Sequence, residues 1–256
     1  ARLGIPTAIH ESNAVPGLTT KLLIPYARRI MVGFEDCRQH YPDPEKVVVT
    51  GTPVRRDFFD LTKAQARQRL GLSDERPLIV SFWGSLGAAG MNEQMADMLA
   101  LEAAHQPFHH IHGAGSEAGL AAITARLKER GVEIGRCPAL RLFPYIHDMA
   151  PTLRAADLVL CRAGASTVSE LTALGVPAIL VPSPYVTNHH QEKNAAALAH
   201  GGGAWVLTEY AATGQSLFQA ACAILHDEGR REKMAGAMAA LGIRDAADRM
   251  LLAILP

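Results

Sequence analysis

The sequence predicts an α/β fold of parallel sheets covered by helices on both faces. Strand-like runs alternate with helical patterns through most of the 256 residues. Several strand-like runs, such as Leu-Val-Leu-Cys at 158–161, are apolar without interruption, as expected of parallel strands buried on both faces. Glycine-rich turns repeatedly follow a strand and open a helix. These three observations together favour repeated βα units.

The individual elements follow from apolar periodicity and from their boundary residues. We expect strands at residues 7–10, 29–32, 46–50, 78–82, 108–112, 157–161, 178–181 and 204–207. We expect helices at 19–27, 63–70, 92–104, 117–130, 148–155, 167–174, 192–200, 216–226, 229–240 and 246–255.

One domain boundary is visible. A charged, turn-rich segment at 51–57 follows a strand, and a new polar helix is expected from Lys63. We expect the C-terminal part of one Rossmann-like domain at residues 1–60 and a complete Rossmann-like domain at 61–240. A helix within 241–256 either continues the second domain or packs back on the first. Leu-Gly-Ile-Pro at 3–6 is typical of a helix end followed by a strand, so we expect the chain to be part of a longer protein.

The composition excludes several classes of protein. The 25 basic and 25 acidic residues balance, and aromatic residues make up only 5%, so nucleic acid is not expected as a partner. The four cysteines are scattered without a Cys-x-x-Cys pair, which favours reduced thiols in the cytoplasm. No apolar run approaches the ~20 residues of a membrane span.

The most informative stretch is residues 161–170, Cys-Arg-Ala-Gly-Ala-Ser-Thr-Val-Ser-Glu. A buried strand runs into small residues that open a helix, so the amides of Ala165, Ser166 and Thr167 form a ready phosphate site. Glu170 follows about one turn later, where a carboxylate could accept both hydroxyls of a ribose. This pattern indicates a nucleotide, and specifically a nucleotide-sugar.

A second turn of this kind, Gly-Ser-Leu-Gly-Ala-Ala-Gly at 84–90, also follows a strand. It could bring backbone and the Ser85 hydroxyl to a pyrophosphate, or it could be a plain tight turn. The turn at 112–116 is better interpreted as structural. His109 and His110 point to opposite faces of their strand and cannot share one metal ion, so no metal site is expected.

Two further loops could complete a nucleotide-sugar site. Ile146 follows an expected strand end at Phe143, where exposed backbone could hold a planar base; an ordinary capped helix is the alternative. Gln191 and Glu192 lie in the polar stretch at 182–194, which could contact sugar hydroxyls or be a solvated helix start. A serine hydrolase is excluded because no Gly-x-Ser-x-Gly elbow is present.

The first segment offers the groups for the opposite side of a cleft. His10 and Glu11 end a strand, where either could orient an acceptor hydroxyl; His10 could equally be structural. Arg55 follows the strand at 46–50 and could pair with a leaving diphosphate.

Six stretches in this order resemble the MurG family, the N-acetylglucosaminyltransferases that complete the cell-wall precursor lipid II. They are residues 10–17 (His-Glu-Ser-Asn-Ala-Val-Pro-Gly), 51–55 (Gly-Thr-Pro-Val-Arg), 84–88 (Gly-Ser-Leu-Gly-Ala), 146–149 (Ile-His-Asp-Met), 162–170 and 188–195 (Asn-His-His-Gln-Glu-Lys-Asn-Ala). The resemblance implies a GT-B-like fold and no cofactor. It also implies that the chain lacks roughly the first hundred residues of the family.

The resemblance implies a role for each singled-out position. Glu170 would bind the ribose and Ile146 the uracil of UDP-N-acetylglucosamine. Ser85, Arg55 and the amides at 165–167 would hold the diphosphate, while Gln191 and Glu192 would contact the sugar. Asn13, and with it His10 and Glu11, would face the acceptor, with the main base in the segment that is not part of the chain. Ser12, Thr52 and Trp83 depart from the family pattern, and Trp83 could crowd the diphosphate loop or wall the cleft.

The activity implied is an inverting, metal-independent transfer of N-acetylglucosamine from UDP to lipid-linked muramoyl-pentapeptide. The enzyme would work on the cytoplasmic membrane surface, which it would contact through the N-terminal part that is not present. The alternatives are another GT-B enzyme, such as a glycolipid glycosyltransferase or a UDP-N-acetylglucosamine 2-epimerase, and a non-catalytic nucleotide-sugar-binding subunit that needs a partner chain.

Overall fold

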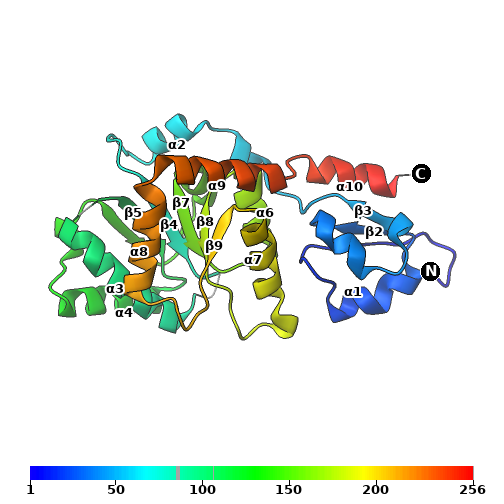
Figure 1. Cartoon of the computed structure of the whole chain (residues 1–256), viewed down its shortest axis with the longest axis horizontal. Helices are drawn as coiled ribbons and strands as arrows, with labels where there is room; N and C mark the ends of the chain where they lie inside the picture. Colours follow the sequence, from blue (N-terminus) through cyan, green and yellow to red (C-terminus); the bar gives the residue numbers. More distant parts are fainter. Residues whose placement is uncertain (85–86, 106, 256) are drawn as a thin grey trace.

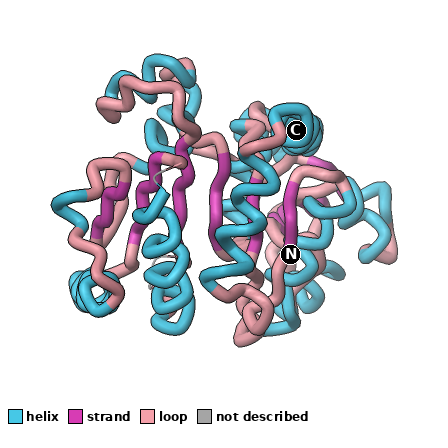
Figure 2. The backbone as a smooth tube through the Cα atoms, turned by 60° about the vertical axis from the view of Figure 1, so that its left-hand side comes forward, coloured by secondary structure: helices cyan, strands magenta, loops and turns pink. Residues whose placement is uncertain are grey.

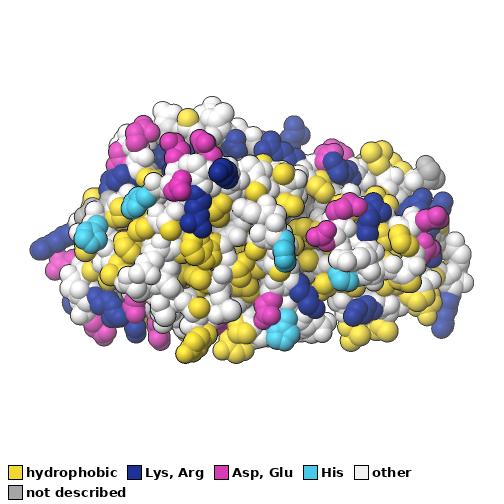
Figure 3. Space-filling model, viewed as in Figure 1, with side chains coloured by type: hydrophobic (Ala, Val, Ile, Leu, Met, Phe, Trp, Pro, Cys, Tyr) yellow, Lys and Arg dark blue, Asp and Glu magenta, His cyan; other side chains and the backbone are white. Residues whose placement is uncertain are grey.

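The strands of the chain form two separate parallel sheets (Figure 1). The computed structural model describes residues 1–84, 87–105 and 107–255. Within these residues the first sheet has three strands and the second has six. Basic and acidic side chains are interspersed over the face shown in Figure 3, in keeping with the balanced charge of the sequence.

The first sheet has the order β1-β2-β3. Its strands are β1 (Ala8–Glu11), β2 (Arg29–Val32) and β3 (Val47–Val49), all parallel. Helix α1 (Leu18–Leu23) and a 3₁₀ turn (Ile24–Tyr26) connect β1 to β2, and 3₁₀ turns at Glu35–His40 and Pro44–Lys46 connect β2 to β3. A small core of Ile30, Val32 and Val47 packs against buried Cys37 and Tyr41.

The second sheet has the order β6-β5-β4-β7-β8-β9, with every pair parallel. The strands are β4 (Leu78–Phe82), β5 (His109–Gly113), β6 (Leu140–Phe143), β7 (Leu158–Cys161), β8 (Ala178–Leu180) and β9 (Ala204–Val206). Counted within this sheet, the order is the 3-2-1-4-5-6 of a Rossmann fold. The direction of winding therefore reverses between β4 and β7.

Helices cover both faces of the second sheet (Figure 2). One face packs against α3 (Ala89–His105), α4 (Glu117–Glu129) and α8 (Gly214–Leu225). The other packs against α2 (Lys63–Arg69), α5 (Met149–Ala155), α6 (Ala165–Leu174), α7 (His190–His200) and α9 (Glu228–Leu241). Since both faces are covered, strands such as β7 and β8 carry apolar residues on both sides, as their uninterrupted hydrophobic runs predict.

The expected elements are present, with a few shifted ends and one omission. Strand β6 was expected only through its end at Phe143 and not as a range, because its sequence Leu-Arg-Leu-Phe places a charge in a four-residue run at the sheet edge. The expected helix at 19–27 is α-helical only to Leu23 and continues as a 3₁₀ turn, where Pro25 removes a backbone donor. Helices α6 and α7 each begin two residues earlier than expected.

Two chain segments connect the two parts of the chain, at residues 50–62 and 242–245. Each contains a glycine whose backbone lies close to a neighbouring segment. Gly51 has φ +77°, and a Cβ built there would lie 2.8 Å from the Cβ of Ile243. A Cβ at Gly242 would lie 2.3 Å from the carbonyl oxygen of Thr172. The two glycines let these segments cross close to each other and to α6.

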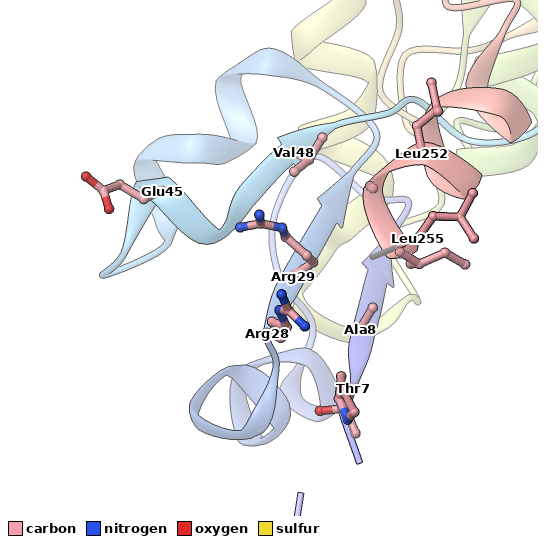
Figure 4. Close-up of a pocket in the computed structure, with 11 residues that line it drawn as sticks. Thr7, Ala8, Arg28, Arg29, Glu45, Val48, Leu252 and Leu255 are labelled. Atoms are coloured by element: carbon pink, nitrogen blue, oxygen red, sulfur yellow. The ribbon is translucent and has the colours of Figure 1, made fainter. Parts of the chain in front are cut away.

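The last helix, α10 (Ala246–Ile254), returns to the first sheet and contacts β2. A groove of about 370 Å³ lies between α10 and the strands, lined by Ala8, Arg29, Val48, Leu252 and Leu255 among others (Figure 4). The part of the chain that the structure describes holds no helix long and apolar enough to cross a membrane. The division of the chain at residues 60 and 240 remains a prediction.

A buried polar network lies inside the second sheet. Ser81 Oγ is 2.7 Å from His110 Nε2 and 2.7 Å from His112 Nδ1, and His110 Nδ1 is 2.8 Å from Glu102 Oε2. A carboxylate only accepts, so we assign a proton to His110 Nδ1; Ser81 then donates to His110 Nε2 and accepts from His112 Nδ1. His112 Nε2 has no hydrogen-bond partner among the described residues. Burial is the main cause that lowers the pKa of His112, to about 3.

We predict that this histidine makes the protein less stable in mild acid. In the unfolded chain this histidine takes up a proton near pH 6.5, whereas folded His112 stays neutral to a much lower pH. The contribution of neutral His112 to the free energy of unfolding is therefore complete above pH 6.5 and is lost as the pH falls toward 3. The expected loss between pH 7 and pH 5 is about 2 kcal/mol or less. Urea unfolding at both pH values measures it.

The matched variants are His112→Asn and His200→Asn. The loss should shrink in the first and persist in the second, since His200 is exposed. An equal loss in wild type and His112→Asn would contradict the assignment.

Candidate functional site

The site forms where the winding of the second sheet reverses. The loops that leave the carboxyl ends of β4 and β7 diverge to opposite faces, and ligands of open α/β sheets bind in the resulting crevice. The loop after β4 contains Ser85, which lies outside the described residues. The loop after β7 leads into α6.

The N-terminus of α6 presents backbone donors that no described side chain caps. Gly164 is the N-cap residue, with φ −66° and ψ 142°, and the first turn carries no acidic residue. The first α-helical backbone bond runs from the Val168 amide to the Gly164 carbonyl at 2.9 Å, so the preceding amides at 165–167 point outward. Together with the helix dipole they form an anion-binding site.

Arg162 holds this loop in place. Its side chain is buried, with Nη1 3.1 Å from the Val181 carbonyl oxygen and 2.8 Å from Glu209 Oε2. The arginine thus connects the end of β7 to the end of β8. Its charge pairs with Glu209 rather than with a ligand.

Glu170 lies half-buried one turn into α6. Burial raises the pKa of its carboxyl group, while the charge of Arg55 opposes that shift and Asp57 adds to it. A carboxylate held partly out of water without a described hydrogen-bond donor gains from a ligand that supplies hydroxyl groups.

Ile146 lies in the turn between β6 and α5, beside the carboxyl end of β5. Its side chain is buried, and a Cβ added to Gly113 would lie 3.2 Å from Ile146 Cδ1. Glycine at the end of β5 therefore lets this turn approach the strand closely. Asp148 makes no capping hydrogen bond to α5 and instead pairs with Arg69 at 3.5 Å.

The loop before α7 is strained. Asn188 and His189 both adopt left-handed backbone conformations, with φ of 58° and 50°, and such strain concentrates at functional sites. Gln191 Oε1 accepts from the Ser183 amide at 2.9 Å, so its side chain spans the loop. Glu192 is exposed and pairs with His189 Nδ1 at 3.0 Å.

On the side of the first sheet, Glu11 organises the loop that follows β1. Its buried carboxylate accepts from the Asn13 and Gly17 amides at 3.1 and 2.9 Å, from Asn13 Nδ2 at 3.0 Å and from Thr20 Oγ1 at 2.6 Å. Burial raises the pKa of Glu11, but these hydrogen bonds outweigh it and the pKa is lowered. His10 Nε2 donates to the Gly51 carbonyl at 3.0 Å.

The remaining predicted positions lie at the surface or inside the core. Arg55 is exposed, 3.3 Å from Asp57, and its guanidinium lies over the Phe58 ring. Trp83 is 3% exposed and packs in the core, so it does not line an open cleft. Asn194, which sequence reasoning treated only as part of a polar loop, is fully buried and joins the two halves of the site. Its spacing from the buried Leu198 on α7 indicates the buried face of the helix, but nothing local in the sequence indicates its partners.

Residues 78–250 match the model of the glycosyltransferase family 28 C-terminal domain. The chain belongs to glycosyltransferase family 28. The match covers the whole second sheet and therefore includes the loops around α6 and α7.

Curated relatives from this family align along almost the entire chain. A protein of Acetivibrio thermocellus is 40% identical over 250 residues, which are 98% of this chain and 66% of that protein. A protein of Bacillus subtilis is 36% identical over 251 residues, 98% of this chain and 67% of its own length. Both are named UDP-N-acetylglucosamine–N-acetylmuramyl-(pentapeptide) pyrophosphoryl-undecaprenol N-acetylglucosamine transferase. The chain thus spans about two thirds of their length.

Solved structures agree with a GT-B fold. MurG of Acinetobacter baumannii superposes with a TM-score of 0.78 at 30% identity, covering 99% of this chain and 67% of that one. A UDP-GlcNAc 2-epimerase of Neisseria meningitidis superposes with a TM-score of 0.68 at 14% identity, over 98% of this chain and 70% of its own. At that identity the second likeness concerns the fold alone.

The α6 N-terminus offers a direct test of anion binding. Gly164→Asp places a good N-cap carboxylate where Gly164 already has suitable dihedral angles and open space. We expect stability to stay the same or to rise by a few tenths of a kcal/mol, while binding of UDP is lost because the carboxylate occupies the anion site. Thermal unfolding and UDP titration measure the two effects. Retention of UDP affinity in a folded variant would place the phosphate elsewhere.

Proposed function

We propose that this chain is the donor-binding part of an N-acetylglucosaminyltransferase. The enzyme transfers N-acetylglucosamine from UDP-N-acetylglucosamine to lipid-linked muramoyl-pentapeptide in peptidoglycan synthesis. The names of the relatives, at up to 40% identity along the chain, support this substrate pair. The observation that carries the proposal is the free N-terminus of α6 at the reversal of the sheet, with Glu170 one turn inside the helix.

On the donor side, each group has a chemical task. The amides of Ala165, Ser166 and Thr167 bind the diphosphate, and the Glu170 carboxylate accepts from the ribose hydroxyls. The turn at Ile146 holds the uracil edge through its backbone, while Gln191 and Glu192 contact the sugar. Ser85 completes the diphosphate site as a prediction from the sequence.

The transfer itself is a direct displacement with inversion at the sugar carbon. An acceptor hydroxyl gives its proton to a base and attacks the sugar carbon, the bond from that carbon to the UDP oxygen breaks, and UDP leaves with the negative charge. The dipole of α6 and its free amides stabilise that charge. Arg55 adds to this when it exchanges its exposed pairing with Asp57 for the diphosphate.

On the acceptor side, the geometry gives Glu11 and His10, at the end of β1, different roles. The Glu11 oxygens already accept four hydrogen bonds, so Glu11 shapes the loop that carries Asn13. His10 donates through Nε2 to Gly51, which leaves Nδ1 as its basic atom. His10 can therefore orient an acceptor hydroxyl, and we place the main base in the third of the relatives' length that this chain does not span.

The lipid-linked acceptor requires work at the cytoplasmic face of a membrane. Helix α1 supports this, since Leu18, Leu22 and Tyr26 are 67%, 65% and 60% exposed on the helix and the turn that follows it, with Lys21 beside them. Figure 3 shows hydrophobic side chains below the first sheet, where Figure 1 places α1. Apolar side chains next to a basic one are suited to a lipid surface.

The proposal is tested by calorimetric titration with UDP-N-acetylglucosamine. We expect saturable binding, weakened tenfold or more in Glu170→Gln, because the ionised acceptor of the ribose is lost. The exposed Glu117 on α4 supplies the matched control, and Glu117→Gln should bind as the wild type does. Equal binding of UDP-glucose and ADP-glucose, or full affinity in Glu170→Gln, would contradict the proposed donor.

The same variant tests the electrostatics of the free site. Burial raises the pKa of Glu170, so the ionised group costs folding energy when no ligand is bound. Glu170→Gln should therefore unfold at the same temperature as the wild type or up to about 2–4 °C higher, a gain of at most about 1 kcal/mol. Unfolding at a clearly lower temperature would show that Glu170 is a structural group.

A further inference from the structure

The carboxamide of Asn194 lies fully buried between the two halves of the molecule. Its Oδ1 accepts from the Ala14 amide at 2.8 Å. Its Nδ2 donates to Asn13 Oδ1 at 3.1 Å and to the Ala163 carbonyl oxygen at 3.0 Å. One side chain thus satisfies three polar groups from two separate parts of the chain.

These partners belong to opposite sides of the proposed cleft. Asn13 and Ala14 lie in the loop after β1, which Glu11 holds in shape. Ala163 directly precedes Gly164, the N-cap residue of α6. Asn194 itself lies on α7, one turn after Gln191, and Figure 1 shows α7 as the helix of the larger part nearest to the first sheet. A continuous path of hydrogen bonds therefore runs from Glu11 through Asn13 and Asn194 to the loop that opens α6.

Two further kinds of connection join the two parts: Phe34 after β2 packs against both hydrophobic cores, and the chain itself crosses twice. The chain crosses at residues 50–62 and 242–245, where Gly51 packs against Ile243 and Arg244 Nε donates to the Ala173 carbonyl at the end of α6. These crossings sit at the opposite end of α6 from Gly164. The two chain crossings can act as a hinge, and Asn194 joins the two parts of the molecule on the side away from that hinge.

We propose that Asn194 is a positioning residue that clasps the loop after β1 to the loop that opens α6 and so sets the closed arrangement of the two parts of the molecule. The clasp follows from the geometry alone, and its consequence for glycosyl transfer rests on the proposed function. An asparagine suits this place because its carboxamide both accepts and donates, whereas an aspartate would face two oxygen atoms without a proton to give. Leaving the Ala14 amide, Asn13 Oδ1 or the Ala163 carbonyl oxygen buried and unpaired costs free energy. We therefore expect the three hydrogen bonds to break together when the two parts separate.

The Ala14 amide reports on the clasp. Its hydrogen bond goes to a side chain of the other half, so its hydrogen exchange measures opening between the halves rather than unfolding of either one. We expect Asn194→Ala to raise this exchange rate at least tenfold, measured by NMR, with the amides of β4 and β7 unchanged. The radius of gyration from small-angle scattering should rise, and the affinity for UDP should stay within about threefold, since the donor groups lie on one side. Lys193→Ala, an exposed neighbour on α7, should match the wild type.

A second variant separates the clasp from damage to α7. Asn13→Ala removes one acceptor from the opposite side and should also speed exchange at Ala14 while leaving the amides of α7 protected. Unchanged exchange at Ala14 in Asn194→Ala and Asn13→Ala would overturn the proposal. It would also be overturned if Asn194→Ala sped exchange equally in β4 and β7 while Asn13→Ala left Ala14 protected. If the wild type fails to bind UDP, the proposed function fails, and the exchange data decide the clasp independently.

Discussion

The strand order of the second sheet is the constraint on which the rest of the structure depends. Because the winding reverses between β4 and β7, their following loops separate and leave backbone amides uncovered at the sheet edge. Small residues after β7 allow α6 to begin there with a glycine cap, so its dipole points into the opening. Glu170 follows from the helical repeat, which places it one turn further in. The anion site thus results from topology first and from particular side chains second.

Buried polar groups give this sheet a defined arrangement around the opening. Ser81, His110 and Glu102 form a satisfied chain within the core, and Arg162 after β7 pairs with Glu209 after β9, across the end of β8. Such networks cost free energy to desolvate and specify one geometry when every member is paired. The orphaned Nε2 of His112 is the exception, and it couples this core to pH.

The fold could be predicted from the sequence because apolar runs and turn residues act locally. Uninterrupted runs such as that of β7 indicate strands buried on both faces, and residues 161–170 carry both the strand and the helix start. Of strand β6 only the end at Phe143 could be recognised, since Arg141 interrupts a run of four residues at an edge. The pairing of Asn194 with Ala14 joins positions 180 residues apart, and no local pattern encodes such a contact.

The candidate site was predicted only in part for the same reason. Glu170 and the amides at 165–167 are close in sequence, so their helical spacing already predicts how they lie relative to each other on α6. The state of Glu11 depends on four donors brought together by a folded loop, and its role as an organiser of that loop emerges only from the structure. Arg55 likewise pairs with Asp57 in the free protein, a competition that the motif alone does not reveal.

The most direct test of this account is an NMR titration of the amide-assigned protein with UDP-N-acetylglucosamine. The account predicts that the largest saturable shifts fall on the amides of Ala165, Ser166 and Thr167, with a second group around Ile146. Saturable shifts centred elsewhere, for example in the groove beside α10, with the α6 amides unmoved, would contradict it.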